Sequence, residues 1–209
     1  MDTIDPKTIK AFVAACHKVA EYGLIRCSSG NLSWRIGKNL ALLSASRSWL
    51  GELNDSQVAI CELDSEKCIN GKTPTVETRF HLGILKQRPE MNVVLHFQSP
   101  FATAIACGDP SRYDYNVIIE IPVYVGDPAV IDYFMPGTEP LAQKVIEAMR
   151  DHDMAILRNH GLVTCGKDFN DAIQKAVFFE LACQILLAQP KANALPPDAL
   201  PPLRAAGKG

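Results

Sequence analysis

The chain has 209 residues, of which 47% are hydrophobic and 21% charged, so it is long enough to bury one hydrophobic core. Its net charge of -2 gives no indication that it binds nucleic acid or an acidic membrane. Seven cysteines without a Cys-x-x-Cys pair argue against a disulfide framework and a zinc ribbon. The N-terminus lacks the features of a signal peptide, and no apolar run approaches the roughly 20 residues that span a bilayer. We therefore expect a cytoplasmic protein with no membrane segment.

The first half of the chain predicts two helices with short strands between them. Asp5-Pro6 is typical of a helix start, because Asp can act as the N-cap and Pro suits the first helical turn. Thr75 can cap a second helix that runs to about Gln87, and Arg88-Pro89 ends it. Strands are expected at residues 32–35, 40–43 and 58–63, with a second short strand toward Ile69.

The second half opens on a buried strand, Val93–Phe97, in which apolar and aromatic residues surround a histidine. Helices are expected to begin after Ser99, Thr138 and Asp168. The remaining extended segments are expected at residues 117–125, 154–157 and 162–165. Because strands outnumber what one helix per crossover would serve, we expect a largely antiparallel or mixed central sheet with helices on its faces.

These elements predict one domain. No internal repeat is visible, and the chain from Gln189 onward is rich in Pro and Ala. Such a composition at a chain end is typical of a mobile segment. We therefore expect a single domain over residues 1–188 and a mobile C-terminal tail over residues 189–209.

Candidate metal ligands lie at the ends of expected strands. His96 and Gln98 are two residues apart, so they project together from the C-terminal end of the buried strand. A His-x-His pair there would be an ordinary metal clamp, whereas Gln offers a weaker, neutral oxygen. His160 lies in a tight turn between two expected strands. If these strands are neighbours, the three side chains converge, although each histidine alone is more often a satisfied core residue.

Glu77 is a candidate general acid/base. It falls in the first turn of an expected helix, where the macrodipole favours a carboxylate. It could therefore be an ordinary helix charge, a partner for Arg79, or a proton-transfer group beside a metal. The other histidines, which we assign structural or solvent roles, are His17, His81 and His152.

Three short loops contain small, hydroxyl-bearing residues, at 28–31, 44–47 and 72–75. Together they could form an anion pocket from hydroxyls, backbone N–H groups and the guanidinium of Arg47. Taken singly, each loop is an ordinary turn. Arg47 could bind a phosphate, bind a carboxylate, or be solvated.

In this order, the motifs resemble the class II aldolase/adducin family, whose best-known members are similar to fuculose-1-phosphate aldolase. The resemblance extends from about Ile9 to Leu187. It rests on five segments: Ser29-Gly30-Asn31-Leu32-Ser33, Leu43-Ser44-Ala45-Ser46, Thr75-Val76-Glu77 with Phe80-His81, residues 94–104, and residues 157–163.

The resemblance implies a fold, an assembly and a set of site residues. The fold is an α/β, three-layer α/β/α sandwich with a central, mainly antiparallel sheet, and the assembly is a homotetramer with sites between subunits. The family's divalent metal ion, often zinc, would be held at His96, Gln98 and His160, and its acid/base carboxylate matches Glu77. The phosphate-binding positions of the family match Gly30, Asn31, Ser46, Arg47, Thr75 and Val76.

Three positions depart from the family pattern. Gln98 replaces a histidine, which opens the site to Mn, Fe, Co or Mg as well as Zn. Arg47 stands where aldolases usually have Gly, and Val76 where a serine hydroxyl often contacts phosphate. The expected function is a metal-dependent carbon–carbon lyase that acts on a small sugar phosphate, or a related hydroxy-carbonyl compound, through an enediolate. A decarboxylase or dehydratase of the same family and a metal-free, adducin-like binding module are the alternatives.

Overall fold

The structure is a computed structural model that describes residues 4–207. Seven strands form one sheet in the order β3-β2-β1-β4-β7-β6-β5. All neighbouring strands are antiparallel except β5 and β6, which are parallel. The strands are β1 (Asn31–Arg35), β2 (Leu40–Ser44), β3 (Val58–Glu62), β4 (Val93–Phe97), β5 (Ala129–Ile131), β6 (Met154–Leu157) and β7 (Gly161–Gly166).

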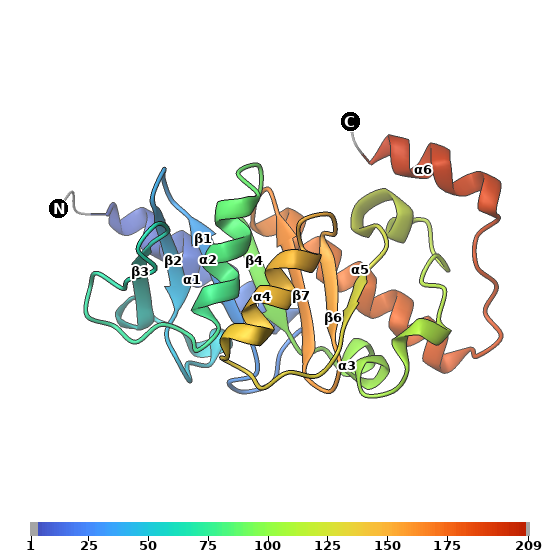
Figure 1. Cartoon of the computed structure of the whole chain (residues 1–209), viewed down its shortest axis with the longest axis horizontal. Helices are drawn as coiled ribbons and strands as arrows, with labels where there is room; N and C mark the ends of the chain where they lie inside the picture. The colour runs from blue at the N-terminus through green and yellow to red at the C-terminus, as the bar shows by residue number, and fades with distance from the viewer. Residues whose placement is uncertain (1–3, 208–209) are drawn as a thin grey trace.

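Helices cover both faces of this sheet. Figure 1 shows α2 and α4 in front of the sheet and α1 and α5 behind it. The α-helices are α1 (Pro6–Glu21), α2 (Thr78–Gln87), α3 (Pro100–Ala106), α4 (Glu139–Ala148), α5 (Phe169–Ala188) and α6 (Leu200–Ala206). The predicted three-layer α/β/α sandwich with a mainly antiparallel sheet is therefore confirmed.

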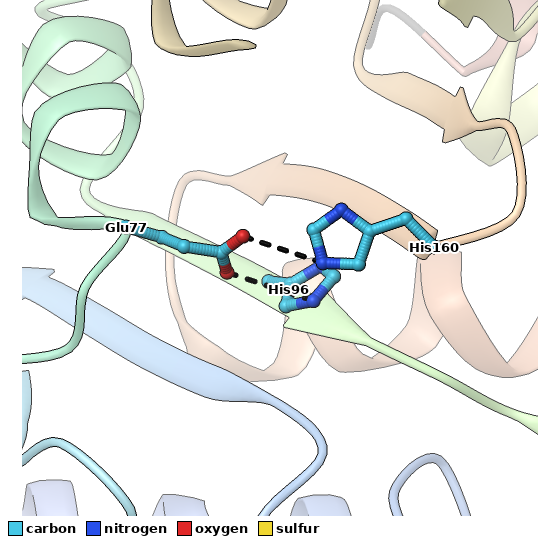
Figure 2. Close-up of side chains that lie close together, drawn as sticks. All are labelled: Glu77, His96 and His160. Carbon is cyan, nitrogen blue, oxygen red and sulfur yellow. Dashed lines mark ion pairs between the residues drawn. The ribbon is translucent and has the colours of Figure 1, made fainter. Parts of the chain in front are cut away.

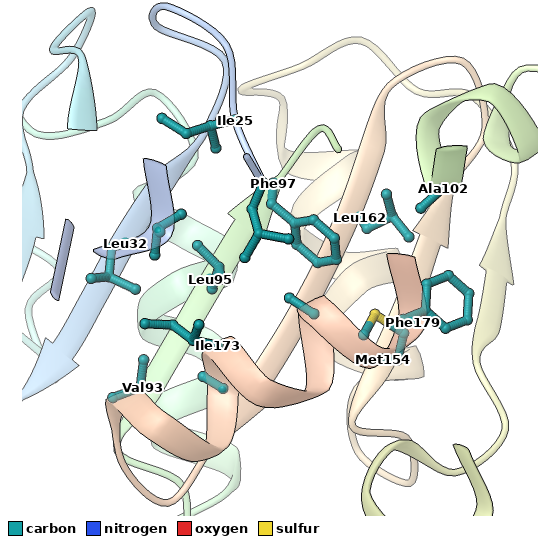
Figure 3. Packing of buried hydrophobic residues seen from close by; sticks show 14 of the residues in the cluster. Ile25, Leu32, Val93, Leu95, Phe97, Ala102, Met154, Leu162, Ile173 and Phe179 are labelled. Atoms are coloured by element: carbon teal, nitrogen blue, oxygen red, sulfur yellow. The ribbon is translucent and has the colours of Figure 1, made fainter. Parts of the chain in front are cut away.

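The two faces of the central strand β4 pack into different cores. Val93, Leu95 and Phe97 point toward the layer of α1, α3 and α5, as Figure 3 shows for part of that core. Val94 packs in the second core, with the residues of α2 and α4. Because side chains alternate along a strand, His96 is directed to the α2 side of the sheet. The strand thus places a histidine next to the start of α2.

Two of the predicted helix N-caps, Asp5 and Asp168, are confirmed, and a third, Thr75, is not. The carboxylates of Asp5 and Asp168 accept backbone N–H groups of α1 and α5, as predicted. The prediction that Thr75 caps the next helix is wrong, because α2 begins at Thr78 with Glu77 as its N-cap. The Thr75 N–H donates to the carbonyl of Ser44 at 3.1 Å, so this segment is held beside the end of β2 before the helix can begin.

The extended conformation predicted for residues 117–125 is wrong. Ile121–Val125 forms a π-helical turn, closed by a hydrogen bond from the Gly126 N–H to the Ile121 carbonyl. The β-branched residues favour a strand, but Pro122 lacks the N–H that a sheet neighbour would need. The turn instead buries Ile121, Pro122 and Val125. The second short strand expected toward Ile69 is reduced to one antiparallel bridge between Cys61 of β3 and Cys68, next to which the Ile69 N–H donates to the Ile60 carbonyl at 2.8 Å.

The C-terminal segment contains a helix that the sequence analysis did not anticipate. Figure 1 shows α6 at the end of a long connection from α5. The Arg204 guanidinium pairs with the Asp127 carboxylate at 2.8 Å. The division at residue 188 and the mobility of the tail stay predictions. Within residues 4–207, the helices lack the length and apolar character needed to cross a membrane.

Candidate active site

Three predicted site residues meet at one end of the central strands. His96 is the penultimate residue of β4 and lies opposite Asn31 of β1 in the sheet register. Glu77 stands at the N-terminus of α2, and His160 lies in the turn between β6 and β7. Figure 2 shows the Glu77 carboxylate directed at both imidazole rings. Glu77 Oε2 is 3.6 Å from His96 Nε2, and Glu77 Oε1 is 3.4 Å from His160 Nε2.

The hydrogen bonds of His96 fix which of its nitrogens is free. His96 Nδ1 lies 2.9 Å from the backbone carbonyl of Leu162. A carbonyl oxygen can only accept, so Nδ1 carries a hydrogen and Nε2 is the nitrogen that faces Glu77. This arrangement is the one by which a protein commonly orients a metal-binding histidine.

Burial and charge set the protonation of the other two residues. Burial, with a smaller contribution from His96, lowers the pKa of His160 to about 4 even though Glu77 opposes this shift. Burial raises the pKa of Glu77, but His96, His160 and a hydrogen bond from Asn31 together hold it below its usual value. Near neutral pH the cluster therefore contains an ionised carboxylate and a neutral His160 imidazole.

The cluster has the donor set of a divalent metal site. One ligand atom from each of Glu77, His96 and His160 lies within 4.8 Å of the other two. Glu77 Oε1 and His160 Nδ1 are buried and make no hydrogen bond. A buried carboxylate oxygen without a partner is costly unless a cation faces it. Two imidazoles and a carboxylate are ordinary zinc ligands, so these residues fit a divalent ion.

Gln98 lies beside the cluster, just beyond the end of β4. Its backbone N–H donates to the Leu24 carbonyl at 3.0 Å, so the chain leaves the sheet here. A Cβ atom at Gly161 would lie 2.8 Å from Gln98 Cγ and 3.1 Å from His96 Cε1. Glycine at this position therefore lets the start of β7 approach both side chains. Whether the carboxamide binds the ion stays a prediction.

Two of the predicted anion-binding residues, Asn31 and Thr75, contact Glu77. Asn31 donates to Glu77 Oε2 at 3.1 Å, and the Thr75 hydroxyl accepts the Glu77 N–H at 3.4 Å. Gly30 has φ +150°, and a Cβ there would lie 2.9 Å from the His96 carbonyl oxygen, so the site loop requires glycine. The Ser46 N–H donates to the carbonyl of Thr73, which pairs two of the predicted loops.

Arg47 lies in the same loop as Ser46, but its side chain has other neighbours. Its backbone is left-handed, with φ +63°. Its side chain lines a separate hollow with Trp49, Glu52, Asn54 and Gln57. A role for Arg47 in binding substrate stays a prediction.

His81 lies beside the cluster, in contacts that the sequence analysis did not anticipate. It was assigned a structural or solvent role, and its ring is fully buried and bonds to Asn31 Oδ1 and to the Ser33 hydroxyl. Burial lowers the pKa of His81 to about 3. Spacing could have indicated it, because Glu77 and His81 are four residues apart on a helix, and Asn31 and Ser33 two apart on a strand.

Comparisons with known proteins match most of the chain to one family. Residues 10–187 match the family model for the class II aldolase and adducin N-terminal domain. The chain is 30% identical to an L-fuculose phosphate aldolase of Methanococcus maripaludis over 83% of this chain and 92% of that protein. It is 32% identical to a 3-oxo-tetronate 4-phosphate decarboxylase of Haemophilus influenzae over 73% of each chain.

A solved structure gives the same result for the fold. An L-fuculose 1-phosphate aldolase superposes with a TM-score of 0.87 over 98% of both chains, at 22% sequence identity. The two sequence relatives are both enzymes, an aldolase and a decarboxylase. The chain therefore belongs to the class II aldolase and adducin family, among its metal-dependent enzymes.

Proposed function

We propose that this protein is a metal-dependent carbon–carbon lyase that cleaves a small sugar phosphate, or a related hydroxy-carbonyl compound, by retro-aldol chemistry. One observation carries the proposal. A buried carboxylate, Glu77, faces two imidazole nitrogens, and one of its oxygens has no hydrogen-bond partner. That combination supplies a site for a cation and a group that can hold a proton.

His96, Gln98 and His160 would hold the metal ion, and the Glu77 carboxylate would lie beside it. Zinc is our first choice because imidazole nitrogens are typical zinc ligands. Gln98 adds a hard, neutral oxygen, which also suits Mn, Fe, Co or Mg. When bound, the ion would polarise the carbonyl of the substrate and stabilise the negative charge that develops on it.

Glu77 is the proposed acid/base. In a retro-aldol reaction the hydroxyl on one side of the breaking bond loses its proton and becomes an aldehyde. The electron pair of the carbon–carbon bond passes to the carbonyl side as an enediolate, and a proton then adds to that carbon. Glu77 Oε1, which is free of hydrogen bonds, is the atom that we assign to hold this proton.

A decarboxylase is the second candidate function. It is supported by the chemistry of the two relatives' substrates, which lead to the same intermediate. Cleavage of L-fuculose 1-phosphate and loss of carbon dioxide from 3-oxo-tetronate 4-phosphate both leave the enediolate of dihydroxyacetone phosphate. The same proton-holding carboxylate could therefore serve either reaction. The two differ in the fragment that leaves, an aldehyde or carbon dioxide. Gly30, Asn31, Ser46, Arg47 and Thr75 are the residues that we propose to bind the phosphorylated part of the substrate.

The assembly and the compartment belong to the same proposal. We propose a homotetramer with sites at subunit interfaces and a cytoplasmic location, both on the strength of the family resemblance. Sedimentation of the purified protein checks the assembly, and a monomer at the concentrations used for activity would contradict it.

The test combines metal analysis with two assays. Protein purified without chelator is loaded with Zn, Mn, Fe, Co or Mg and incubated with L-fuculose 1-phosphate or 3-oxo-tetronate 4-phosphate. We expect release of dihydroxyacetone phosphate from at least one compound, with lactaldehyde or carbon dioxide identifying the reaction. Glu77→Gln keeps an oxygen near the ion but cannot act as a base, so kcat should fall by more than about 100-fold.

The control is Glu147→Ala, which removes an exposed carboxylate on α4 and should leave activity unchanged. A metal content far below one ion per subunit that none of the five metals restores would contradict the proposal. So would full activity in the Glu77→Gln variant.

A further inference from the structure

A chain of buried polar side chains leads away from Glu77 between β1 and α2. Asn31 donates to Glu77 Oε2, its Oδ1 contacts His81 Nε2, and His81 Nδ1 lies 2.8 Å from the Ser33 hydroxyl. Ser33 and His81 are fully buried, and Asn31 is only 9% exposed. These hydrogen bonds connect Glu77, the candidate acid/base, to Ser33, which lies two residues after Asn31 on β1.

The partners in this hydrogen-bonded chain define one arrangement of its hydrogens. A carboxylate can only accept, so Asn31 must turn its NH₂ group toward Glu77 and its Oδ1 toward His81. The Nε2 of His81 must then carry the ring hydrogen in order to donate to that oxygen. The lone pair on His81 Nδ1 is left to accept the Ser33 hydroxyl.

The local geometry explains how the chain is assembled. Asn31 and Ser33 point to the same face of β1, the one covered by α2. Glu77 and His81 are one turn apart on α2, so they face β1 together. Asn31 also lies opposite His96 in the sheet, which puts the amide beside the two candidate ligands.

We propose that Ser33 and His81 are positioning residues, which hold the Asn31 amide as a donor to Glu77 Oε2 and so leave Oε1 as the oxygen that holds the proton. This inference rests on the proposed role of Glu77. Without the hydrogen bonds from Ser33 and His81, the Asn31 amide could rotate and offer its oxygen to Glu77. The Glu77 carboxylate could then turn away from the substrate. Neither residue touches substrate in this account.

The first experiment observes the hydrogen position directly. Metal-free protein labelled with ¹⁵N-histidine has five histidines to resolve, and loss of a signal in His81→Gln assigns His81. We expect His81 to be neutral with its hydrogen on Nε2, and Ser33→Ala to give a mixture of the two tautomers. A hydrogen on Nδ1 in the native protein would overturn the inference, whatever reaction the enzyme catalyses.

The second experiment measures kcat and KM in the metal-loaded enzyme, with whichever of L-fuculose 1-phosphate and 3-oxo-tetronate 4-phosphate it converts. Ser33→Ala and His81→Leu should lower kcat by about tenfold or more, since the lost contact acts on proton transfer. Because Asn31 is also proposed to bind the phosphorylated part of the substrate, KM should rise, but by a smaller factor than kcat falls. His81→Gln keeps an N–H donor and should restore most of kcat.

Thr164→Val is the matched control, because it removes another fully buried hydroxyl, one that bonds to the Asp153 carbonyl at the far end of the sheet. Its kcat should match that of the native enzyme. Native kcat in both Ser33→Ala and His81→Leu would overturn the inference. If the native enzyme converts neither compound, the proposed function fails, and the histidine spectrum still decides the hydrogen-bonded chain.

Discussion

One side chain, Gln98, separates the cluster from a site with three histidines. Its neighbours Glu77, His96 and His160 already provide a carboxylate and two nitrogens. Imidazole binds zinc more strongly than a neutral carboxamide oxygen does. The difference between Gln and His at this position should therefore appear directly in metal affinity.

We predict that Gln98→His lowers the Kd for zinc. The measurement is competition between a chelator of known affinity and metal-free protein. Gln143→His is the control, because it adds a histidine to the exposed face of α4 without touching the cluster. A zinc Kd that stays the same in Gln98→His would mean that the side chain at this position does not face the ion.

At the scale of single residues, the sequence predicted which side chains lie together better than it predicted the hydrogen bonds among them. His96, His160 and Glu77 were identified from motif positions, and they lie together as expected. The chain through His81 and Ser33 was missed because it exists only when α2 lies over β1. No local pattern encodes that packing, although the spacing within each element is compatible with it.

At the level of elements, α3 depends on a residue from another helix for its N-terminal cap. Ser99 is the N-cap residue but makes no side-chain capping bond. Glu180, from α5, instead accepts hydrogen bonds from the Ser99 hydroxyl and from the N–H groups of Phe101 and Ala102, at 2.6–2.9 Å. Because α3 begins two residues after Gln98, this contact also anchors the segment beside the cluster.

We predict that Glu180→Ala lowers the free energy of unfolding by roughly 1.5–3 kcal/mol, since it removes a charged acceptor and leaves donors at a helix start unpaired. Urea denaturation measures the loss. Glu180→Gln keeps an acceptor and should lose less. A change no larger than that of the exposed Glu147→Ala would contradict this role for Glu180.

Helices were predicted correctly where an N-cap residue precedes a segment with helical hydrophobic periodicity. Asp5 and Asp168 cap their helices as predicted because the capping contact lies within a few residues of sequence. Residues 121–125 were mispredicted because strand propensity there competes with burial against α5, which is a tertiary effect. The start of α2 was displaced from Thr75 for a similar reason, namely the pairing of Thr75 with Ser44.

At the scale of the whole molecule, a partly buried ionic network joins the two helix layers at the end of the sheet opposite the cluster. Asp153, just before β6, accepts from Arg88 at the end of α2 at 2.7 Å and from Lys175 of α5 at 2.8 Å. The two cations come from opposite faces of the sheet. Burial raises the pKa of Asp153, but Lys175 and Arg88 outweigh it and hold that pKa below its usual value.

We predict that Asp153→Asn lowers the free energy of unfolding by about 3 kcal/mol near neutral pH, because the buried Lys175 and the partly buried Arg88 lose a charged partner. The pKa of Asp153 is lower in the folded state than in the unfolded state. Its contribution is therefore complete above the unfolded pKa of about 3.9 and is lost as the pH falls through the folded pKa.

The difference in stability between native protein and Asp153→Asn should consequently be constant from about pH 7 to pH 5 and shrink below about pH 4. Urea denaturation at several pH values measures it. Zinc content per subunit should not change near neutral pH, because the network lies at the opposite end of β4 from His96. A stability difference that stayed constant down to pH 3 would show that the Asp153 charge does not act through this network.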